Sequence, residues 1–319
     1  MAVSRIFPTS YHQSREEFLQ DLSLIQDRWP SARLESREVS AEDVLAVEWI
    51  AADPTGSPQK ALVLTCGLHG IEGYVGAGMR KLFLDQFLEG INQTTTGLYL
   101  VHAINPWGME HMRRVSRNNI DLNRNFAQEP EDFQETINPA YQYYDHIINP
   151  DRPLGALELE KLRVVSRVVR ELMKSGMTHL RNAVLQGQRS NLEGIFCAGR
   201  AYEPETLVMM DLLNGILSTY QDVLLLDMHT GYGPKFQMSI INSPQESRTT
   251  AQMQRDFQYP LVLKADPEDF YIMQGDMVNW LYELHRSTGF EGRFYAAAFE
   301  FGTIGESMLG EFISLWNLI

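Results

Sequence analysis

The feature that most constrains the fold is the run DVLLLDMH at residues 222–229, which is apolar at almost every position. A strand with one face in water alternates apolar and polar residues, whereas a strand covered on both faces is a nearly continuous apolar run. This run therefore predicts a central strand of a sheet with helices on both faces. Residues 61–66 and 293–302 predict two further strands.

The alternation of strand and helix patterns along the chain predicts one α/β domain over residues 1–319, with a mainly parallel or mixed sheet. The polar stretch at 106–153, with two Asn-Pro pairs, predicts a long surface loop. The remaining expected strands are 44–52, 97–105 and 236–242, and the expected helices are 14–29, 75–90, 156–176, 203–220, 246–257, 275–288 and 304–317.

Charge and composition exclude several partners. The net charge of −14 argues against nucleic acid or an anionic membrane, because phosphate binding needs clustered Lys and Arg. No apolar stretch approaches the roughly 20 residues of a membrane helix, and the N-terminus has no secretory pattern. The two cysteines, Cys66 and Cys197, are expected to be buried as free thiols. We expect a cytoplasmic protein, and its oligomeric state stays open.

Three residues of metal-ligand type lie at predicted strand ends. His69 and Glu72 directly follow the strand at 61–66, and His229 ends the strand at 222–229. Ligands of open α/β sheets gather beyond the carboxyl ends of the strands, so these side chains can converge. Two histidines and one carboxylate, with a fourth position for water, form a common catalytic zinc set. H-x-x-E alone is a weak signal, since a histidine at a strand end is more often structural.

A second motif adds weight to this interpretation. The segment NPWGMEHMRRVSRNNIDLNRNF at 105–126 concentrates arginine and asparagine in an otherwise acidic chain. A charge run is more often a solvated surface, but guanidinium groups also suit a carboxylate or a developing oxyanion. The candidates for this chemistry are Arg113, Arg114, Arg117, Asn123 and Arg124.

Four motifs, GLHGIEG, NPWG…RRVSRNNIDLNRNF, DMHTGYG and FEFGT, resemble in this order the zinc metallocarboxypeptidase (carboxypeptidase A-like) family. The resemblance covers about residues 60–305, is most specific in DLNRNF, and is closest to a bacterial carboxypeptidase-like branch of unassigned substrate. It implies the carboxypeptidase-like (phosphorylase/hydrolase-like) fold, which is an α/β fold with a mixed, twisted central sheet flanked by helices. It also implies a zinc-dependent hydrolase that cleaves an amide bond next to a free carboxylate.

The resemblance assigns a metal centre with its base. It implies one Zn²⁺ per chain, held by His69, Glu72 and His229. Glu300, in AAAFEFGT, would be the general base that takes a proton from zinc-activated water and passes it to the leaving amine. A carboxylate at the end of an apolar strand agrees with such a role, because burying it without a partner is costly.

The basic segment receives the substrate-side roles. Arg114 would stabilise the oxyanion, although a small gap would align Arg117 instead. Asn123 and Arg124 would hold the terminal carboxylate of the substrate. Asp121 would orient a zinc-bound histidine through its ring N–H.

Three points remain open at the level of sequence. The family's substrate-capping tyrosine has no firm counterpart, and Tyr271 and Tyr232 are both candidates. The substrate is a peptide or an N-acyl amino acid with a free carboxylate, so an alternative is a deacylase of the succinylglutamate desuccinylase/aspartoacylase type. DLNRNF and the lack of a separate C-terminal β-domain favour the peptidase. A zinc-binding protein without catalysis is a third possibility, against which the intact base and arginines argue.

Overall fold

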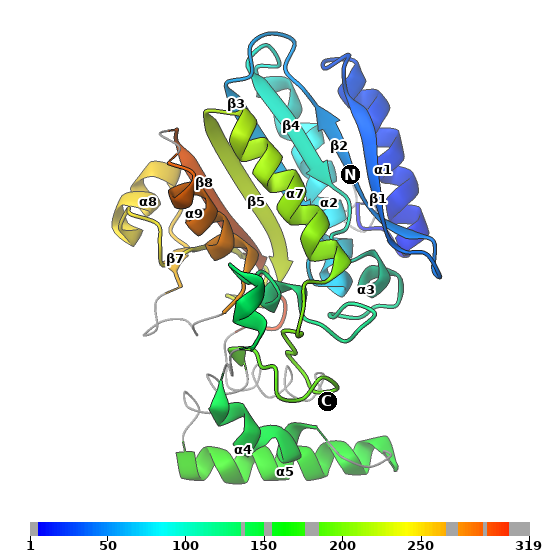
Figure 1. Cartoon of the computed structure of the whole chain (residues 1–319), viewed down its shortest axis with the longest axis vertical. Coiled ribbons are helices and arrows are strands. Elements are labelled where there is room, and N and C mark those ends of the chain that lie inside the picture. Colours follow the sequence, from blue (N-terminus) through cyan, green and yellow to red (C-terminus); the bar gives the residue numbers. More distant parts are fainter. Residues whose placement is uncertain are drawn as a thin grey trace.

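The fold is built on one eight-stranded sheet (Figure 1). The structure is a computed structural model that describes residues 6–134, 138–149, 155–175, 185–265, 274–289 and 292–305. The strands follow the order β1-β2-β4-β3-β5-β8-β6-β7 across the sheet. Their bounds are β1 Arg33–Ser40, β2 Leu45–Ala52, β3 Lys60–Cys66, β4 Thr96–Val101, β5 Asp222–Thr230, β6 Met238–Asn242, β7 Val262–Lys264 and β8 Phe294–Phe301.

The sheet is mixed, as the resemblance to the carboxypeptidase-like fold implies. Its centre is parallel, because β4, β3, β5 and β8 run in the same direction, while β2 and β6 pair antiparallel to this block. The apolar strand β5 lies between β3 and β8 in the middle of the sheet. The carboxyl ends of β3, β5 and β8 therefore meet at one edge.

Helices cover both faces of the sheet. Figure 1 shows α7 and α9 over the near face and α2 behind the sheet. None of the helices in the described residues is long and apolar enough to cross a lipid bilayer. The helix bounds are α1 Tyr11–Gln26, α2 Gly73–Phe87, α3 Pro106–Glu110, α4 Pro139–Ile148, α5 Leu157–Ser175, α7 Pro204–Thr219, α8 Thr250–Phe257 and α9 Met277–Ser287, with short 3-10 turns at η2 Gly70–Glu72, η3 Leu88–Gly90, η4 Leu122–Arg124 and η5 Pro130–Gln134.

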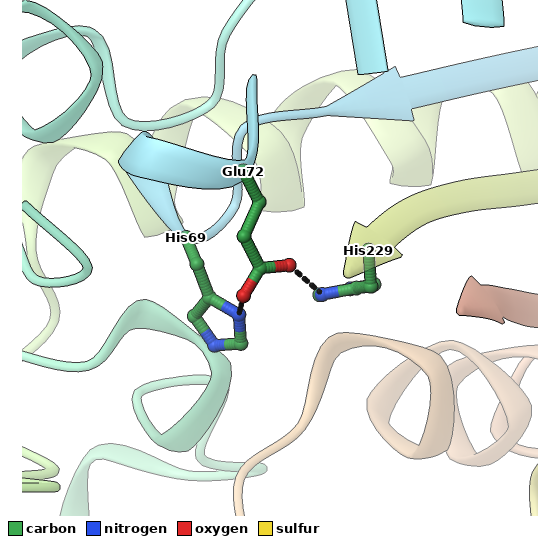
Figure 2. Close-up of side chains that lie close together, drawn as sticks. All are labelled: His69, Glu72 and His229. Carbon is green, nitrogen blue, oxygen red and sulfur yellow. Dashed lines mark hydrogen bonds and ion pairs between the residues drawn. The ribbon is translucent and has the colours of Figure 1, made fainter. Parts of the chain in front are cut away.

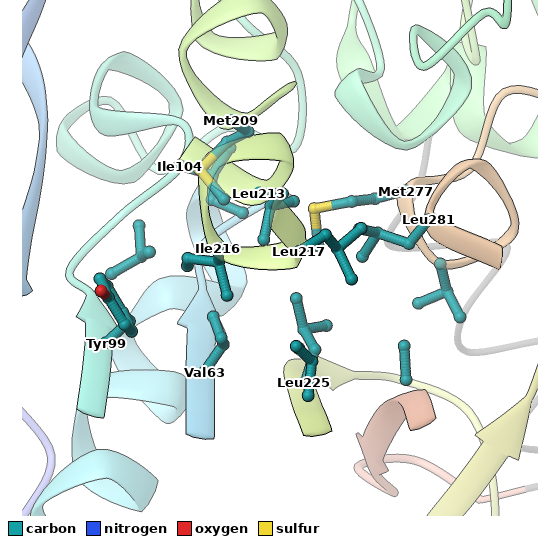
Figure 3. Packing of buried hydrophobic residues seen from close by; sticks show 14 of the residues in the cluster. Val63, Tyr99, Ile104, Met209, Leu213, Ile216, Leu217, Leu225, Met277 and Leu281 are labelled. Carbon is teal, nitrogen blue, oxygen red and sulfur yellow. The ribbon is translucent and has the colours of Figure 1, made fainter. Parts of the chain in front are cut away.

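Each face of the sheet has its own apolar core. On one face, Leu213 and Leu217 of α7 and Leu281 of α9 pack against Val63 and Leu225 (Figure 3). On the other face, α1 and α2 pack against alternate residues of the same strands. The apolar run of β5 is buried on one face at Val223 and Leu225, while on the other face Met228 is buried, Leu226 is half-buried and Leu224 is exposed.

The structure contains elements that the sequence-based expectation lacks, and one expected helix is not tested. The predicted loop at 106–153 contains α4, whose Tyr141, Tyr144 and Ile147 are buried at helical spacing between the two Asn-Pro pairs. Strand β1 was not predicted because its sequence is polar and half-exposed at the sheet edge, and β7 has only three residues. The helix expected at 304–317 lies almost wholly outside the described residues.

Candidate metal centre

The three predicted metal ligands converge at the carboxyl ends of β3 and β5 (Figure 2). The Glu72 carboxylate lies between the two rings: Oε1 is 2.9 Å from His69 Nδ1, and Oε2 is 3.3 Å from His229 Nδ1. One ligand atom from each residue lies within 4.8 Å of the other two, and all three residues are buried. Both histidines therefore turn the same nitrogen, Nδ1, toward the carboxylate.

The chain after β3 has little freedom to place these side chains differently. Gly67 adopts a left-handed φ of +68°, which turns the chain away from the sheet. Gly70 lies against the backbone of α3, where an added Cβ would be 2.2 Å from the carbonyl carbon of Gly108. The turn η2 then brings Glu72 back over the end of β5, where Oε2 accepts a hydrogen bond of 2.8 Å from Thr230 N–H. The glycines around His69 and Glu72 thus serve this close packing.

Each histidine has a carboxylate at its other ring nitrogen. Asp121, at the start of η4, has Oδ1 3.2 Å from His69 Nε2, as the resemblance implies. Asp227 has Oδ2 2.6 Å from His229 Nε2 and was not singled out from the sequence. The sequence contained a signal for Asp227, because it lies two residues before His229 and residues two apart on a strand point to the same face. The Nε2 contacts leave Nδ1 of both rings directed at the presumed metal position.

The electrostatics of the cluster keep Glu72 ionised. Burial alone would raise the pKa of Glu72, but the charges and hydrogen bonds of His69 and His229 hold it below its ordinary range. Burial alone would likewise lower the pKa of His229, but the Asp227 charge and hydrogen bond raise it well above its ordinary value. The lowered pKa of Glu72 and the raised pKa of His229 both come from the attraction between carboxylates and imidazoles. A divalent cation bound here would likewise favour the ionised Glu72 carboxylate.

Glu300 lies beside the metal ligands in the sheet. It is the β8 residue paired in register with His229 of β5, and its Oε2 accepts a long hydrogen bond of 3.4 Å from Tyr232 N–H. Burial raises the pKa of Glu300, and the Glu72 charge adds to this, while His229 opposes it. The structure therefore places a carboxylate of increased basicity next to the cluster.

The two arginines that the sequence leaves as alternatives lie in different places. Arg114 reaches the cluster: its Nη2 is 2.7 Å from His69 Nε2, and its Nε donates to Asp121 at 3.0 Å. Arg117 is exposed and pairs with Glu42 and Asp43 in the turn between β1 and β2. Of these two arginines, Arg114 is the one in contact with the site.

The predicted carboxylate clamp is buried. Arg124 has no exposed surface, and its guanidinium donates to the main-chain carbonyl of Leu185 at 2.7 Å and of Asn123 at 2.9 Å. The side-chain oxygen of Asn123 accepts a hydrogen bond from Met277 N–H at the start of α9. In this conformation both residues bind the protein's own backbone, so their role toward a substrate stays a prediction.

Of the two candidates for a substrate-capping tyrosine, the described residues include Tyr232. Tyr232 follows the end of β5, and its backbone N–H contacts Glu300. Tyr271 lies outside the described residues.

The donor set fits a zinc ion. Two imidazole nitrogens and one carboxylate are ligands that zinc prefers, and their mutual spacing allows one ion to reach all three. The two Nε2–carboxylate contacts are also typical of histidines that bind metals. The cluster His69, Glu72 and His229 can therefore hold a metal ion.

Comparisons with solved structures agree with this fold. Carboxypeptidase A from Helicoverpa armigera aligns with a TM-score of 0.53 and 15% identity over 92% of this chain and 65% of that chain. Bovine thrombin-activatable fibrinolysis inhibitor, in a complex with tick carboxypeptidase inhibitor, aligns with a TM-score of 0.50 and 15% identity over 92% of this chain and 86% of that chain. The chain therefore has a carboxypeptidase A-like fold.

A search of curated proteins returned no match. A family described as protein of unknown function (DUF2817) matches residues 7–312, which is nearly the whole chain. The fold and the His-Glu-His cluster agree with the carboxypeptidase A-like resemblance of the sequence. The chain belongs to the DUF2817 family.

Proposed function

We propose that the protein is a zinc-dependent hydrolase that cleaves an amide bond next to a free carboxylate. The observation that carries this proposal is the convergence of His69, Glu72 and His229 with Glu300 on the neighbouring strand. A bound zinc ion would polarise the scissile carbonyl and acidify water. A metal site with only a structural role would not need a further carboxylate of raised pKa beside its ligands.

Glu300 is the general base in this proposal. A general base is most effective when its pKa lies near the working pH. The raised pKa of Glu300 moves this carboxylate toward that condition. Glu300 takes a proton from the attacking water and passes it to the leaving amine. In the part of the chain that the structure describes, its carboxylate accepts one long hydrogen bond, from Tyr232 N–H, which leaves capacity to accept that proton.

Arg114 is the proposed oxyanion-stabilising residue. Its side chain is 32% exposed and lies against both His69 and Asp121, so its charge is at the edge of the site rather than sealed within the protein. Charge that develops on the carbonyl oxygen would be attracted to this guanidinium. The Asp121 carboxylate holds the guanidinium through Nε and leaves its terminal nitrogens directed at the cluster.

The requirement for a free carboxylate rests on the cations near the cluster. Arg114 is partly exposed, and the buried Arg124 would have to exchange its contacts with Leu185 to bind a substrate directly. Arg124 nonetheless adds a positive charge near Asp121. We propose that this positive region selects substrates that carry a carboxylate beside the scissile amide.

The test uses matched substrates and zinc-loaded protein. One peptide carries a free C-terminal carboxylate, its partner is amidated there, and an N-acyl amino acid supplies the deacylase arm. The free acid should have a larger kcat/KM than the amide by up to about 10⁴-fold, because a site built around a polar contact rejects an analogue that lacks it. Equal rates for the acid and the amide would refute the carboxylate requirement.

The substrate panel also separates the alternatives. Turnover of the N-acyl amino acid without turnover of the peptide would replace the peptidase proposal with the deacylase. Stoichiometric zinc without turnover of any member of the panel would contradict the hydrolase proposal and favour a non-catalytic metal protein. Absence of zinc binding would refute the metal centre itself.

A further inference from the structure

Asp227 lies directly below His229 on β5 and makes one of the shortest contacts near the metal cluster. Its Oδ2 is 2.6 Å from His229 Nε2. Asp227 is 1% exposed and His229 is 3% exposed, so water does not compete strongly for this contact. The two residues belong to the central strand, and alternation along the strand puts both side chains on one face.

A second hydrogen bond holds the carboxylate from the neighbouring strand. Thr65 of β3 is paired in register with Asp227, and its hydroxyl donates to Oδ1 over 2.6 Å. One oxygen of the carboxylate is thus held by Thr65, and the other accepts from the imidazole of His229. The chain Thr65–Asp227–His229 spans two central strands whose backbones are fixed by the parallel ladder.

This arrangement determines which nitrogen of His229 faces the metal position. A carboxylate at Nε2 favours a proton on that nitrogen, so Nδ1, which faces Glu72, is the nitrogen available to a metal ion. The corresponding contact of His69 is weaker, because Asp121 is 3.2 Å away and also accepts from Arg114. His229 is therefore the more firmly oriented of the two imidazoles.

We infer that Asp227 is a positioning residue that orients His229 for metal binding, and that Thr65 holds the Asp227 carboxylate in place. The inference rests on the proposed metal centre but not on any substrate or reaction. Loss of such a carboxylate partner typically weakens metal binding by about 10- to 100-fold.

The test measures zinc affinity by competition with a chromophoric chelator. Asp227→Asn is nearly isosteric, since its amide oxygen can accept from Nε2 and its amide N–H can donate to the Thr65 hydroxyl, so the variant removes only the charge. Asp227→Ala removes both hydrogen bonds. We expect the zinc Kd to rise by about 10-fold for Asp227→Asn and by about 100-fold for Asp227→Ala. Thr65→Val should weaken binding by a smaller factor than Asp227→Asn.

The matched control is Asp222→Asn, at the opposite end of β5, where the carboxylate pairs with Arg293. It makes the same chemical change on the same strand and should leave the zinc Kd unchanged. The second measurement is the visible absorption of the cobalt-substituted protein, which reports ligand geometry and not fold stability. We expect a changed spectrum for Asp227→Asn and the wild-type spectrum for Asp222→Asn.

The outcomes separate this inference from the proposed function. If the wild-type protein binds zinc but both Asp227 variants bind it within twofold of the wild-type Kd, with unchanged cobalt spectra, the positioning role is wrong. If the wild-type protein binds neither zinc nor cobalt, the metal centre is wrong and this inference fails with it. Because Asp227→Asn preserves shape, unfolding of Asp227→Ala would leave the test intact.

Discussion

Glu205, far from solvent in the first turn of α7, allows a stability prediction with a defined pH dependence. Its side chain is 4% exposed, and among the described residues Oε2 has no hydrogen-bond partner. Burial raises the pKa of Glu205 from 4.5 to about 7, and the charge of Glu203 adds to this, while its own backbone N–H opposes it. The folded state therefore favours the protonated carboxyl group.

The sign follows from comparing the folded and unfolded states. Below pH 4.5, Glu205 is protonated in both states and the burial carries no ionic penalty. Above about pH 7 it is charged in both states, and the folded state bears the full cost, so stability falls as the pH rises between these values. One unit of pKa shift is worth about 1.36 kcal/mol, so ionisation of Glu205 lowers the free energy of unfolding by about 3 kcal/mol. The attraction between the carboxylate and the helix N-terminus reduces this loss by about 0.3–1 kcal/mol.

Glu205→Gln removes the ionisable group and keeps the shape. We expect it to stabilise the protein by about 2–3 kcal/mol at pH 8 and to change stability little at pH 4.5. An unfolding entropy of about 2.1 cal/mol/K per residue converts this to a Tm increase of about 3–4 °C at pH 8 for 319 residues.

The assay is thermal unfolding followed by circular dichroism at pH 4.5 and pH 8. Asp211→Asn, at an exposed position of the same helix, is the control and should show no such pH-dependent gain. A Tm change for Glu205→Gln that is the same at both pH values, or a decrease at pH 8, would refute the reasoning.

Three further predictions concern the site. Arg114→Ala should lower kcat by roughly 10²-fold or more, as loss of an oxyanion donor does. Arg117→Ala should have little effect on kcat, because its ion pairs are exposed. The reverse pattern in steady-state kinetics would contradict the assignment of Arg114. Glu300→Gln should retain one zinc by elemental analysis while kcat falls roughly 10²- to 10⁴-fold, and loss of zinc instead would make Glu300 a ligand. Free zinc at 100 times its Kd should stabilise the wild-type protein by about 2.7 kcal/mol relative to protein stripped of zinc by a chelator, and His229→Ala should lack this increase. A zinc-dependent rise in the Tm of His229→Ala would place the metal elsewhere.

Local patterns in the sequence predicted an α/β sheet with a central strand at 222–229, and they singled out the residues of the His69, Glu72 and His229 cluster. The nearly continuous apolar run at 222–229 predicts a central strand, and β5 lies between β3 and β8, although Leu224 stays exposed on one face. His69 and Glu72 are three residues apart beside the end of β3, so their proximity is a short-range property of the chain. His229 joins them because the carboxyl ends of neighbouring parallel strands meet at one edge.

Tertiary structure decided what the basic segment does. Arg114 and Arg117 are chemically equivalent in the sequence, but of the two only Arg114 faces the cluster. Asn119, with a left-handed φ of 63°, belongs to the turn after which the chain returns to the cluster. Arg124 looks like an open cation in the sequence, yet the fold seals it against the carbonyl of Leu185, 61 residues away. Such contacts depend on segments that are distant along the chain, and no local periodicity encodes them.

The contrast is clearest for the two carboxylates behind the histidines. Strand alternation by itself puts Asp227 and His229 on one face, because side chains repeat every two residues. The Asp227 carboxylate is also held by Thr65, and this hydrogen bond exists only because the β3–β5 register brings Thr65 beside Asp227. The sequence by itself determined which side chains lie on the same face of a strand. The packing of separate strands decided which of those side chains form hydrogen bonds, because hydrogen bonds need positions accurate to a few tenths of an ångström.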